Sequence, residues 1–391
     1  MEDLKSADDL PRCPDDELKV LPSRKSLNPY SEIVLVMLFI ISISLPTARM
    51  ALPGYSNHWS AAEQATLAPF PKIGPDLATI KAFPHSFKRY FQENFGFRKP
   101  LLYWHGVFKY SWLKVSSSPF VILGQGGWLF FADEASMESL RCSKPFTNEQ
   151  LAQWKRTLEL RNEVLSKDGM KYLVVVVPDK HTIYPEYVPS AYARINEKSR
   201  REQLIEYLEA NSRLAIIDLT EPLKKAKTAN EIYFRTDTHW NDLGAFVAYQ
   251  EIGRQIGNWY PQIQLRSRSE FNLAHAVSKS GDLARMLGLE GLLTDKLPQL
   301  VSQVPRNTHV TSFGSLHGYI AQCQEAELST AVILRDSFGN ALIPFLSEHF
   351  RRAIYLWANV YAFPQDIIQR ERPQVVIHEF VERLLAGATP P

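Results

Sequence analysis

Five short runs of consecutive apolar residues, with helix-like segments between them, constrain the fold of this chain more than any other feature of its sequence. Continuous apolar runs of this length are typical of strands that are buried on both faces, as in a parallel sheet. Strands that alternate with helices predict an α/β fold, here a three-layer sandwich built around a parallel sheet. The segments that contain these runs are 171–177, 213–220, 331–336, 353–357 and 373–380.

Helix signals fill the intervals between these runs. The longest helix is expected to begin at Thr147 or Asn148, either of which suits the N-cap position, and to end before Gly169. The interval 259–327 shows no regular pattern, so we expect a long irregular segment there. Further helices are expected at 199–212, 241–256, 337–350 and 363–371.

A single uncharged apolar segment, Ile33–Ala48, lies near the N-terminus. It is somewhat short for a membrane-spanning helix, which usually needs about 20 apolar residues. Two interpretations are open, a cleaved signal peptide and an uncleaved signal-anchor. About 30 residues, several of them acidic, precede the segment, whereas a signal peptide has a short basic start. We therefore favour a single-pass anchor, with Lys19, Arg24 and Lys25 keeping the N-terminus in the cytoplasm.

The anchor divides the chain into parts of different character. We expect a cytoplasmic tail at 1–30, a transmembrane signal-anchor at 31–50, a linker rich in Pro, Ala and Ser at 51–85, and one large folded domain at 86–391. The net charge is only +2, and charges of both signs are mixed along the chain. This pattern lacks the clustered basic face of a nucleic-acid-binding protein, so we expect no nucleic-acid partner.

The three cysteines, Cys13, Cys142 and Cys323, lack the CxxC spacing of zinc and redox motifs. Cys142 and Cys323 lie on the same side of the apolar segment. They either form a disulfide in an oxidising compartment or remain free thiols. No cofactor or metal motif stands out in the sequence, and we expect neither.

A serine follows the third apolar run, in the segment RDSFGN. Functional residues of open α/β sheets collect at the carboxyl ends of the strands. Ser337 lies between an expected strand and an expected helix, where its hydroxyl is exposed and its backbone N–H points to the helix N-terminal anion site. Such fixed donors suit a nucleophile whose attack creates an oxyanion. The simpler alternative is that Ser337 or Asp336 only caps the helix.

The segment RTDTHWND supplies a carboxylate and an imidazole two residues apart. Residues i and i+2 of an extended segment face the same way, so Asp237 can orient the ring of His239. With Ser337 they complete a set of nucleophile, base and orienting acid. A capping aspartate and a surface histidine are the structural alternative. A rival functional hypothesis is a divalent metal site formed by Asp179 and His181 together with this Asp-x-His pair.

Seven segments together resemble the alginate O-acetyltransferase AlgJ/AlgX-like family of periplasmic proteins, which contain an SGNH-hydrolase-like domain. Each segment is unspecific alone, but the combination is specific, and it extends from about residue 83 to residue 385. The segments are FGFRKPLL, GQGGWLFF, VVVPDKHTIYPEYVP, RTDTHWND, GDLARMLGL, RDSFGNALIPFLSEHF and VVIHEFVERLL.

The resemblance implies a serine nucleophile at Ser337, with His239 and Asp237 as its partners. In ordinary SGNH hydrolases the serine block comes first and the Asp/His block last. The reversed order in this chain implies a permuted connection of the same sheet.

One departure from the family pattern lies next to the expected nucleophile. Arg335 stands where the family has a glycine before Asp-Ser, and it either crowds the site or adds a positive donor near the oxyanion. The oxyanion blocks of the family are not identifiable, and Asn340 is only a candidate for that role. Trp240, Tyr184 and Lys180 are further candidates for contact with the oxyanion or the substrate.

The resemblance further implies acetyl transfer to an exported polysaccharide, with the acyl donor delivered by a multispanning membrane O-acyltransferase. It places the catalytic domain in the periplasm, anchored in the bacterial inner membrane through residues 33–48. A polysaccharide acetylesterase with the same three residues is one alternative, because water can replace the sugar as acceptor. A non-catalytic polysaccharide-binding scaffold of an assembly complex is another, and the aromatic-rich segment Tyr90–Trp128 favours it.

Overall fold

The computed structural model describes residues 28–51, 59–60, 65–304, 306–314, 318–358 and 361–387. Most of the expected cytoplasmic tail, including its basic residues and Cys13, lies outside the described residues. The chain divides into two compact units, Met1–Asn57 with Ala68–Phe97, and His58–Leu67 with Arg98–Pro391.

The first unit contains two long helices. In α1 (Pro29–Ala51), the 21 residues Tyr30–Met50 have a mean hydropathy of 2.1, which makes this helix long and apolar enough to cross a membrane. In α2 (Leu77–Asn94), the Asp76 carboxylate caps the N-terminus by accepting a 2.8 Å hydrogen bond from the backbone N–H of Thr79. α2 therefore begins inside the segment 51–85 that we expected to be a linker.

The second unit is built around a seven-stranded sheet with the strand order β6-β5-β13-β11-β12-β10-β9. The strands from β6 to β12 are parallel to one another, as the apolar runs predict. The other two, β10 and β9, add to this sheet antiparallel, so the prediction of a purely parallel sheet is corrected to a mixed one. The strands are β5 (Lys171–Val177), β6 (Ile216–Asp218), β9 (Thr308–Phe313), β10 (Gly318–Cys323), β11 (Leu328–Arg335), β12 (Phe350–Trp357) and β13 (Val375–Val381).

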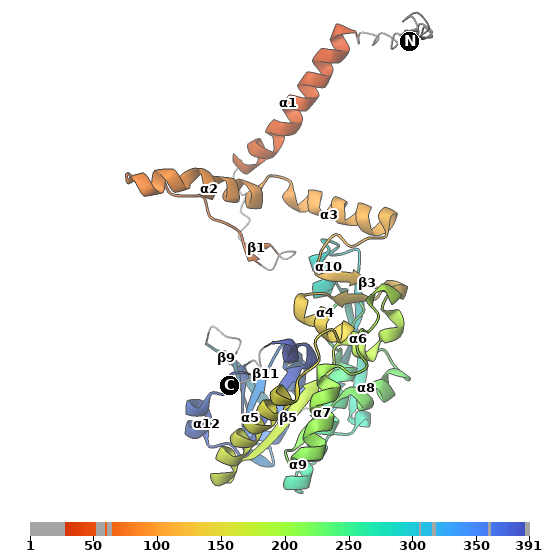
Figure 1. The fold of residues 1–391 in the computed structure, drawn as a ribbon, viewed down its shortest axis with the longest axis vertical. Helices are drawn as coiled ribbons and strands as arrows, with labels where there is room; N and C mark the ends of the chain where they lie inside the picture. Colours follow the sequence, from red (N-terminus) through yellow and green to blue (C-terminus); the bar gives the residue numbers. More distant parts are fainter. Residues whose placement is uncertain are drawn as a thin grey trace, which may run out of the picture. The chain divides into compact units, whose positions relative to one another are not determined.

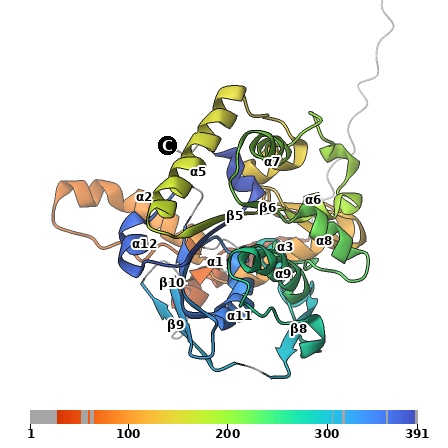
Figure 2. The same cartoon turned by 90° about the horizontal axis from the view of Figure 1, so that it is seen from below.

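Helices cover both faces of this sheet, with α5 and α7 over one face and α9 and α11 over the other (Figure 2). Successive residues of a strand point to opposite faces, which explains why the apolar runs are continuous. In β5, Leu173 and Val175 belong to the hydrophobic cluster with α9, whereas Val174 and Val176 belong to the cluster with α5, α7 and α12. The helices are α5 (Asn148–Lys167), α7 (Arg200–Asn211), α8 (Thr220–Lys227), α9 (Asp242–Trp259), α11 (Ile343–Leu346) and α12 (Gln365–Glu371).

The interval 259–327 is not irregular as expected. It contains the antiparallel pair β7 (Phe271–Lys279) and β8 (Asp295–Ser302), the short helix α10 (Asp282–Met286), and the strands β9 and β10. The expected helix at 337–350 is broken into η6 (Phe338–Leu342), α11 and η7 (Ser347–His349). Pro344 at the start of α11 has no backbone N–H to continue the hydrogen bonds of η6, which accounts for the break.

A smaller layer packs near the carboxyl ends of the parallel strands (Figure 1). Its cluster joins β3 and β4 to α10 and the residues that follow α10. The elements of this layer are α3 (Arg98–Phe108), η1 (Lys109–Leu113), β3 (Val121–Leu123), η2 (Gln125–Gly127), β4 (Leu129–Phe131) and α4 (Glu134–Arg141). The remaining elements are β1 (Trp59–Ser60), β2 (Ala65–Thr66), α6 (Lys180–Ile183), η3 (Pro185–Tyr187), η4 (Ser190–Tyr192), η5 (Arg268–Glu270) and η8 (Glu382–Ala386).

Cys142 and Cys323 are both free, buried thiols. Cys142 follows the last residue of α4, and Cys323 ends β10, near the edge of the sheet. Of the two alternatives that we left open for this pair, a disulfide or free thiols, the structure shows free thiols.

Candidate active site

Ser337 follows β11, an inner strand of the sheet, and occupies the N-cap position of η6. The preceding residue, Asp336, fixes this turn. One oxygen of its carboxylate accepts a 2.8 Å hydrogen bond from the Phe338 N–H, and the other accepts a 2.7 Å bond from the Val381 N–H at the end of β13. Asp336 therefore caps the turn, which leaves the half-buried Ser337 hydroxyl free for another partner.

That partner is His239, which lies 98 residues earlier in the chain. The Ser337 Oγ lies 2.7 Å from His239 Nε2. The other ring nitrogen, Nδ1, lies 2.7 Å from Asp237 Oδ1, and the same carboxylate oxygen accepts a bond from the His239 backbone N–H. The distance between hydroxyl and imidazole is within the range required for proton transfer. The structure thus brings together the three residues that the two sequence segments singled out.

The charges around the imidazole favour its protonated form. Burial alone would lower the pKa of His239, but the hydrogen bond and the charge of Asp237, together with the charge of Asp282, outweigh it and raise the pKa above its ordinary value. Burial likewise opposes ionisation of Asp237, but its hydrogen bond to His239 and the imidazolium charge hold its pKa well below the ordinary range. Asp237 is therefore a permanent anion that stabilises positive charge on His239.

Two carboxylates that the sequence analysis did not single out hold the backbone around Asp237. Asp282 accepts a 2.8 Å hydrogen bond from the Thr238 N–H and donates its own N–H to Asp237 Oδ2 at 2.9 Å. Asp295 accepts bonds of 3.0 and 2.9 Å from the backbone N–H groups of Arg235 and Thr236. Asp282 lies in the segment GDLARMLGL that carried part of the family resemblance, but nothing in that segment reveals its partner.

Lys180, a candidate for substrate contact, is buried below the same loop. Its ammonium donates to the carbonyl oxygens of Phe234, Arg235 and Asp237 at 3.0, 3.2 and 2.6 Å. Burial lowers the pKa of Lys180 to about 8, against the opposing effect of three nearby aspartates. The three donors of this ammonium are therefore used to hold the loop that carries Asp237.

Three other candidates also make polar contacts inside the protein. The Trp240 indole donates to the Phe338 carbonyl at 3.1 Å, and the Tyr184 hydroxyl accepts from the Ile232 N–H at 3.0 Å. The Arg335 side chain is fully buried between the rings of Tyr319 and Trp357, and it donates to the Asp336 carbonyl.

Asn340 is the exposed member of the candidate set. It lies in η6, and its backbone N–H donates to the Ser337 carbonyl at 3.3 Å. Its side chain thus remains available on the surface beside the serine turn.

The structure separates the four residues of the metal hypothesis into two groups. Asp179 and His181 lie with Glu382, whereas Asp237 and His239 lie with Asp282. In the second group the imidazole is hydrogen-bonded directly to a carboxylate and a hydroxyl, a geometry that suits proton transfer.

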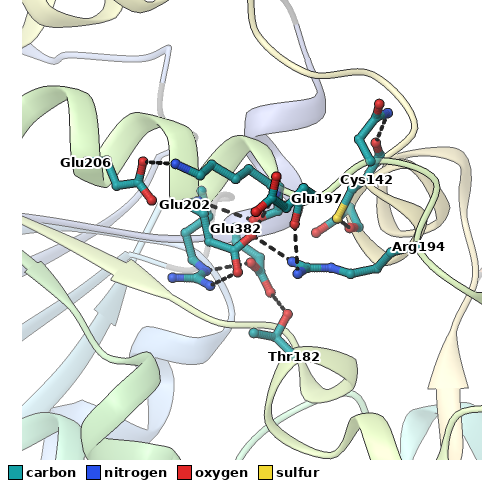
Figure 3. A network of polar contacts seen from close by, with 12 residues as sticks. Cys142, Thr182, Arg194, Glu197, Glu202, Glu206 and Glu382 are labelled. Carbon is teal, nitrogen blue, oxygen red and sulfur yellow. Dashed lines mark hydrogen bonds and ion pairs between the residues drawn. The ribbon is translucent and has the colours of Figure 1, made fainter.

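Glu382, the third member of the first group, is part of an ion-pair network (Figure 3). One of its oxygens accepts from the Asp179 N–H at 2.7 Å and from the Thr182 hydroxyl. The other accepts from Arg201, whose guanidinium also lies 3.6 Å from Glu202, the partner of Arg194. The nearby arginine charge thus compensates the carboxylate of Glu382.

Gly281 provides a test of how closely the Asp237 loop must be positioned. A Cβ atom at this glycine would lie 2.3 Å from the Thr236 carbonyl oxygen and 2.5 Å from the Asp237 nitrogen, so the loop must shift in Gly281→Ala. We expect the turnover of a model acetyl ester to fall roughly 10²-fold, because a displacement of about 1 Å at a catalytic group has an effect of this size.

The matched control for this substitution is Gly257→Ala in α9. The nearest atom to its Cβ is 3.5 Å away, an ordinary contact, so its turnover should equal that of the unmodified chain. Full activity in Gly281→Ala would show that the loop tolerates displacement.

A sheet covered by helices on both faces, with a hydrogen-bonded serine, histidine and aspartate at one edge, defines an α/β protein with the side-chain arrangement of serine-dependent acyl-transfer enzymes. The family model described as "SGNH hydrolase-like domain, acetyltransferase AlgX" matches residues 121–358, more than half of the chain. The chain belongs to this family.

Relatives agree with this assignment, and one solved structure shares the fold. A probable alginate O-acetylase AlgJ of Pseudomonas syringae pv. tomato is 27% identical over 68% of this chain and 69% of its own length. A probable alginate O-acetylase AlgJ of Azotobacter vinelandii is 25% identical over 78% of this chain and 79% of its own. The solved structure of Bacillus cereus PatB1 covers 69% of this chain and 98% of PatB1, with a TM-score of 0.52 and 16% identity, and so shares the fold.

Proposed function

We propose that this protein is a serine-dependent O-acetyltransferase that acts on an exported polysaccharide, with Ser337 as nucleophile, His239 as general base and Asp237 as the acid that orients it. The observation that carries the proposal is the 2.7 Å contact between Ser337 Oγ and His239 Nε2, in a histidine whose other nitrogen is held by Asp237. This arrangement activates a hydroxyl that is otherwise a weak nucleophile.

The first half of the proposed reaction forms an acetyl-enzyme. His239 Nε2 accepts the proton of the Ser337 hydroxyl while Oγ attacks the carbonyl carbon of the acetyl donor. The tetrahedral intermediate collapses when His239 returns this proton to the leaving group, and the acetyl group remains as an ester on Ser337. The anionic Asp237 stabilises the imidazolium that exists between these two proton transfers.

The second half transfers the acetyl group to a sugar. His239 now removes the proton from a sugar hydroxyl, the sugar oxygen attacks the ester carbonyl, and the proton passes to Ser337 as it leaves. Donors are needed for the oxyanion in both halves, and we assign this role to the backbone N–H of Ser337, with the exposed side chain of Asn340 as a second candidate.

The family supports the acceptor and the location that we propose. The relatives carry the name alginate O-acetylase, and a polyuronate is therefore the first acceptor to test. We propose that α1 anchors the chain in the bacterial inner membrane and that the second unit lies in the periplasm, where a multispanning O-acyltransferase supplies the acetyl donor. We attribute the position of the Asp/His block before the serine block to a permuted connection of the SGNH sheet.

The molecule that accepts the acetyl group distinguishes the three candidate functions, which are transferase, esterase and non-catalytic scaffold. The full chain is incubated with an activated acetyl ester, with and without an alginate oligosaccharide, and both free acetate and acetylated sugar are measured. A transferase shifts the acetyl group from water to the oligosaccharide when the sugar is present. Acetate alone, at an unchanged rate, would identify an esterase, and donor turnover no faster than in buffer would indicate a non-catalytic scaffold.

A further inference from the structure

The helix α3 and the turn η1 that continues it expose a row of large apolar side chains. Leu101, Trp104, Phe108 and Trp112 follow one another at intervals of three and four residues, which places them on one helix face. They are 53, 65, 51 and 78% exposed, respectively. We call this set the aromatic face of α3. Scattered apolar side chains on a surface need no explanation, but four large ones on a single helix face mark an interaction surface.

The opposite face of α3 is fixed to the body of the second unit. Gly106 is buried so close to the segment after α10 that a Cβ atom there would lie 2.5 Å from the Leu287 carbonyl oxygen. The same oxygen accepts a 2.7 Å hydrogen bond from the Ser117 hydroxyl, and Val107 and Tyr110 pack on the adjoining cluster. The aromatic face therefore points outward because the other side of the helix is already occupied.

The charged residues near the aromatic face indicate which kind of partner this face binds. Between residues 98 and 120 there are four basic residues, Arg98, Lys99, Lys109 and Lys114, and no aspartate or glutamate. A helix with tryptophan, phenylalanine and leucine on one face and lysine or arginine around it is typical of segments that lie in the headgroup region of an anionic membrane. Tryptophan in particular concentrates at the boundary between water and lipid.

The covalent connection to α1 keeps α3 close to the membrane that α1 is proposed to enter. Fewer than 50 residues separate the end of α1 at Ala51 from the start of α3 at Arg98. A tether of this length keeps α3 at a high effective concentration near the bilayer that α1 enters, so even weak interfacial binding is populated. We propose that the aromatic face of α3 docks onto the anionic phospholipid surface of the membrane that holds α1.

This docking rests on the proposed anchoring and adds a second contact with the membrane. The docking also affects the candidate site, because α10 begins at Asp282, and the Asp282 N–H donates a hydrogen bond to the Asp237 carboxylate. The helix that touches lipid is thus packed against the end of the helix that supports the catalytic loop. The candidate site would then work close to the membrane surface, where a membrane-embedded donor presents its acetyl group.

The test uses the full chain with Cys13→Ser and one added cysteine, labelled with an environment-sensitive fluorophore. Trp104→Cys and Trp112→Cys report on the aromatic face. Leu160→Cys on α5 is the matched control, because Leu160 is a large apolar residue that is 60% exposed elsewhere on the second unit. Ile40→Cys reports separately on insertion of α1. Each protein is reconstituted into vesicles of phosphatidylethanolamine and phosphatidylglycerol, with or without a lipid that carries a quencher near its headgroup.

We expect the probes at 104 and 112 to shift their emission to the blue and to be quenched by the modified lipid, while the probe at 160 does neither. Replacing Lys99, Lys109 and Lys114 together with glutamine should weaken the quenching at 112. Probes at 104 and 112 that behave like the probe at 160 would overturn the docking. The probe at 40 decides the anchoring independently, since emission there that is not shifted to the blue refutes the anchor whatever the aromatic face does.

Discussion

Replacing Ser337 with alanine is expected to lower the rate of acetyl transfer roughly 10⁴-fold or more, because it removes the proposed nucleophile that would carry the acetyl ester. The fold should be retained, since the hydroxyl is half-buried and its hydrogen bond is with His239. Loss of such a hydrogen bond typically costs about 1 kcal/mol of stability. Turnover of an activated acetyl ester and the thermal unfolding midpoint measure the two effects together.

The matched control for this prediction is Ser329→Ala. Ser329 is exposed near the start of the same strand, β11, and its hydroxyl bonds only to Gln374. Its turnover should equal that of the unmodified protein. Full activity in Ser337→Ala would remove the serine from the mechanism, and the group of Asp179, His181 and Glu382 would then be the next to examine.

Replacing Asp237 with asparagine is expected to reduce turnover about 10⁴-fold, the effect of losing the orienting acid in comparable triads. Asp237 Oδ1 accepts from His239 Nδ1 at 2.7 Å, so it keeps the proton on Nδ1 and leaves Nε2 free to accept the serine proton. An amide at this position can present its NH₂ group to Nδ1, which favours the wrong tautomer. The Asp282 N–H would also lose a charged acceptor.

The pH dependence of turnover provides a separate measure of the same variant. A general base acts as neutral imidazole, so if His239 has this proposed role, activity should rise as the pH passes upward through the pKa of His239, which Asp237 raises above its ordinary value. In Asp237→Asn the charge is gone while burial, which lowers this pKa, remains. The remaining activity should therefore rise at lower pH than in the unmodified protein. An unchanged profile would mean that another group titrates.

The central strands could be predicted because each contains consecutive apolar residues that point to both faces. β5, β11 and β13 each contain at least three such residues in a row, and this pattern is typical of a sheet that is covered on both sides. The strands between residues 259 and 327 carry no such signal. In β9, for example, every residue after Thr308 is exposed, and the strand lies at the edge of the sheet. The pairing of β9 therefore depends on its neighbour β10 rather than on its own composition.

The residues of the candidate site also fall into two groups, those that the sequence could reveal and those that it could not. Ser337, His239 and Asp237 could be proposed from the sequence because each is a reactive side chain in a short, unusual segment. The supporting residues could not, because they act through backbone groups. The ammonium of Lys180 and the carboxylate of Asp295 hold the peptide groups of a loop about 55 to 60 positions away, and no pattern of side chains records such contacts.

If Ser337 carries the acetyl group, the intact mass of the full chain should increase by one acetyl group after exposure to an activated acetyl ester. Peptide mapping should locate this group on the segment that contains Ser337, and the adduct should disappear when a sugar acceptor is added. Transfer of acetyl groups to the sugar without any adduct on Ser337, or with the adduct on another residue, would contradict this role of Ser337.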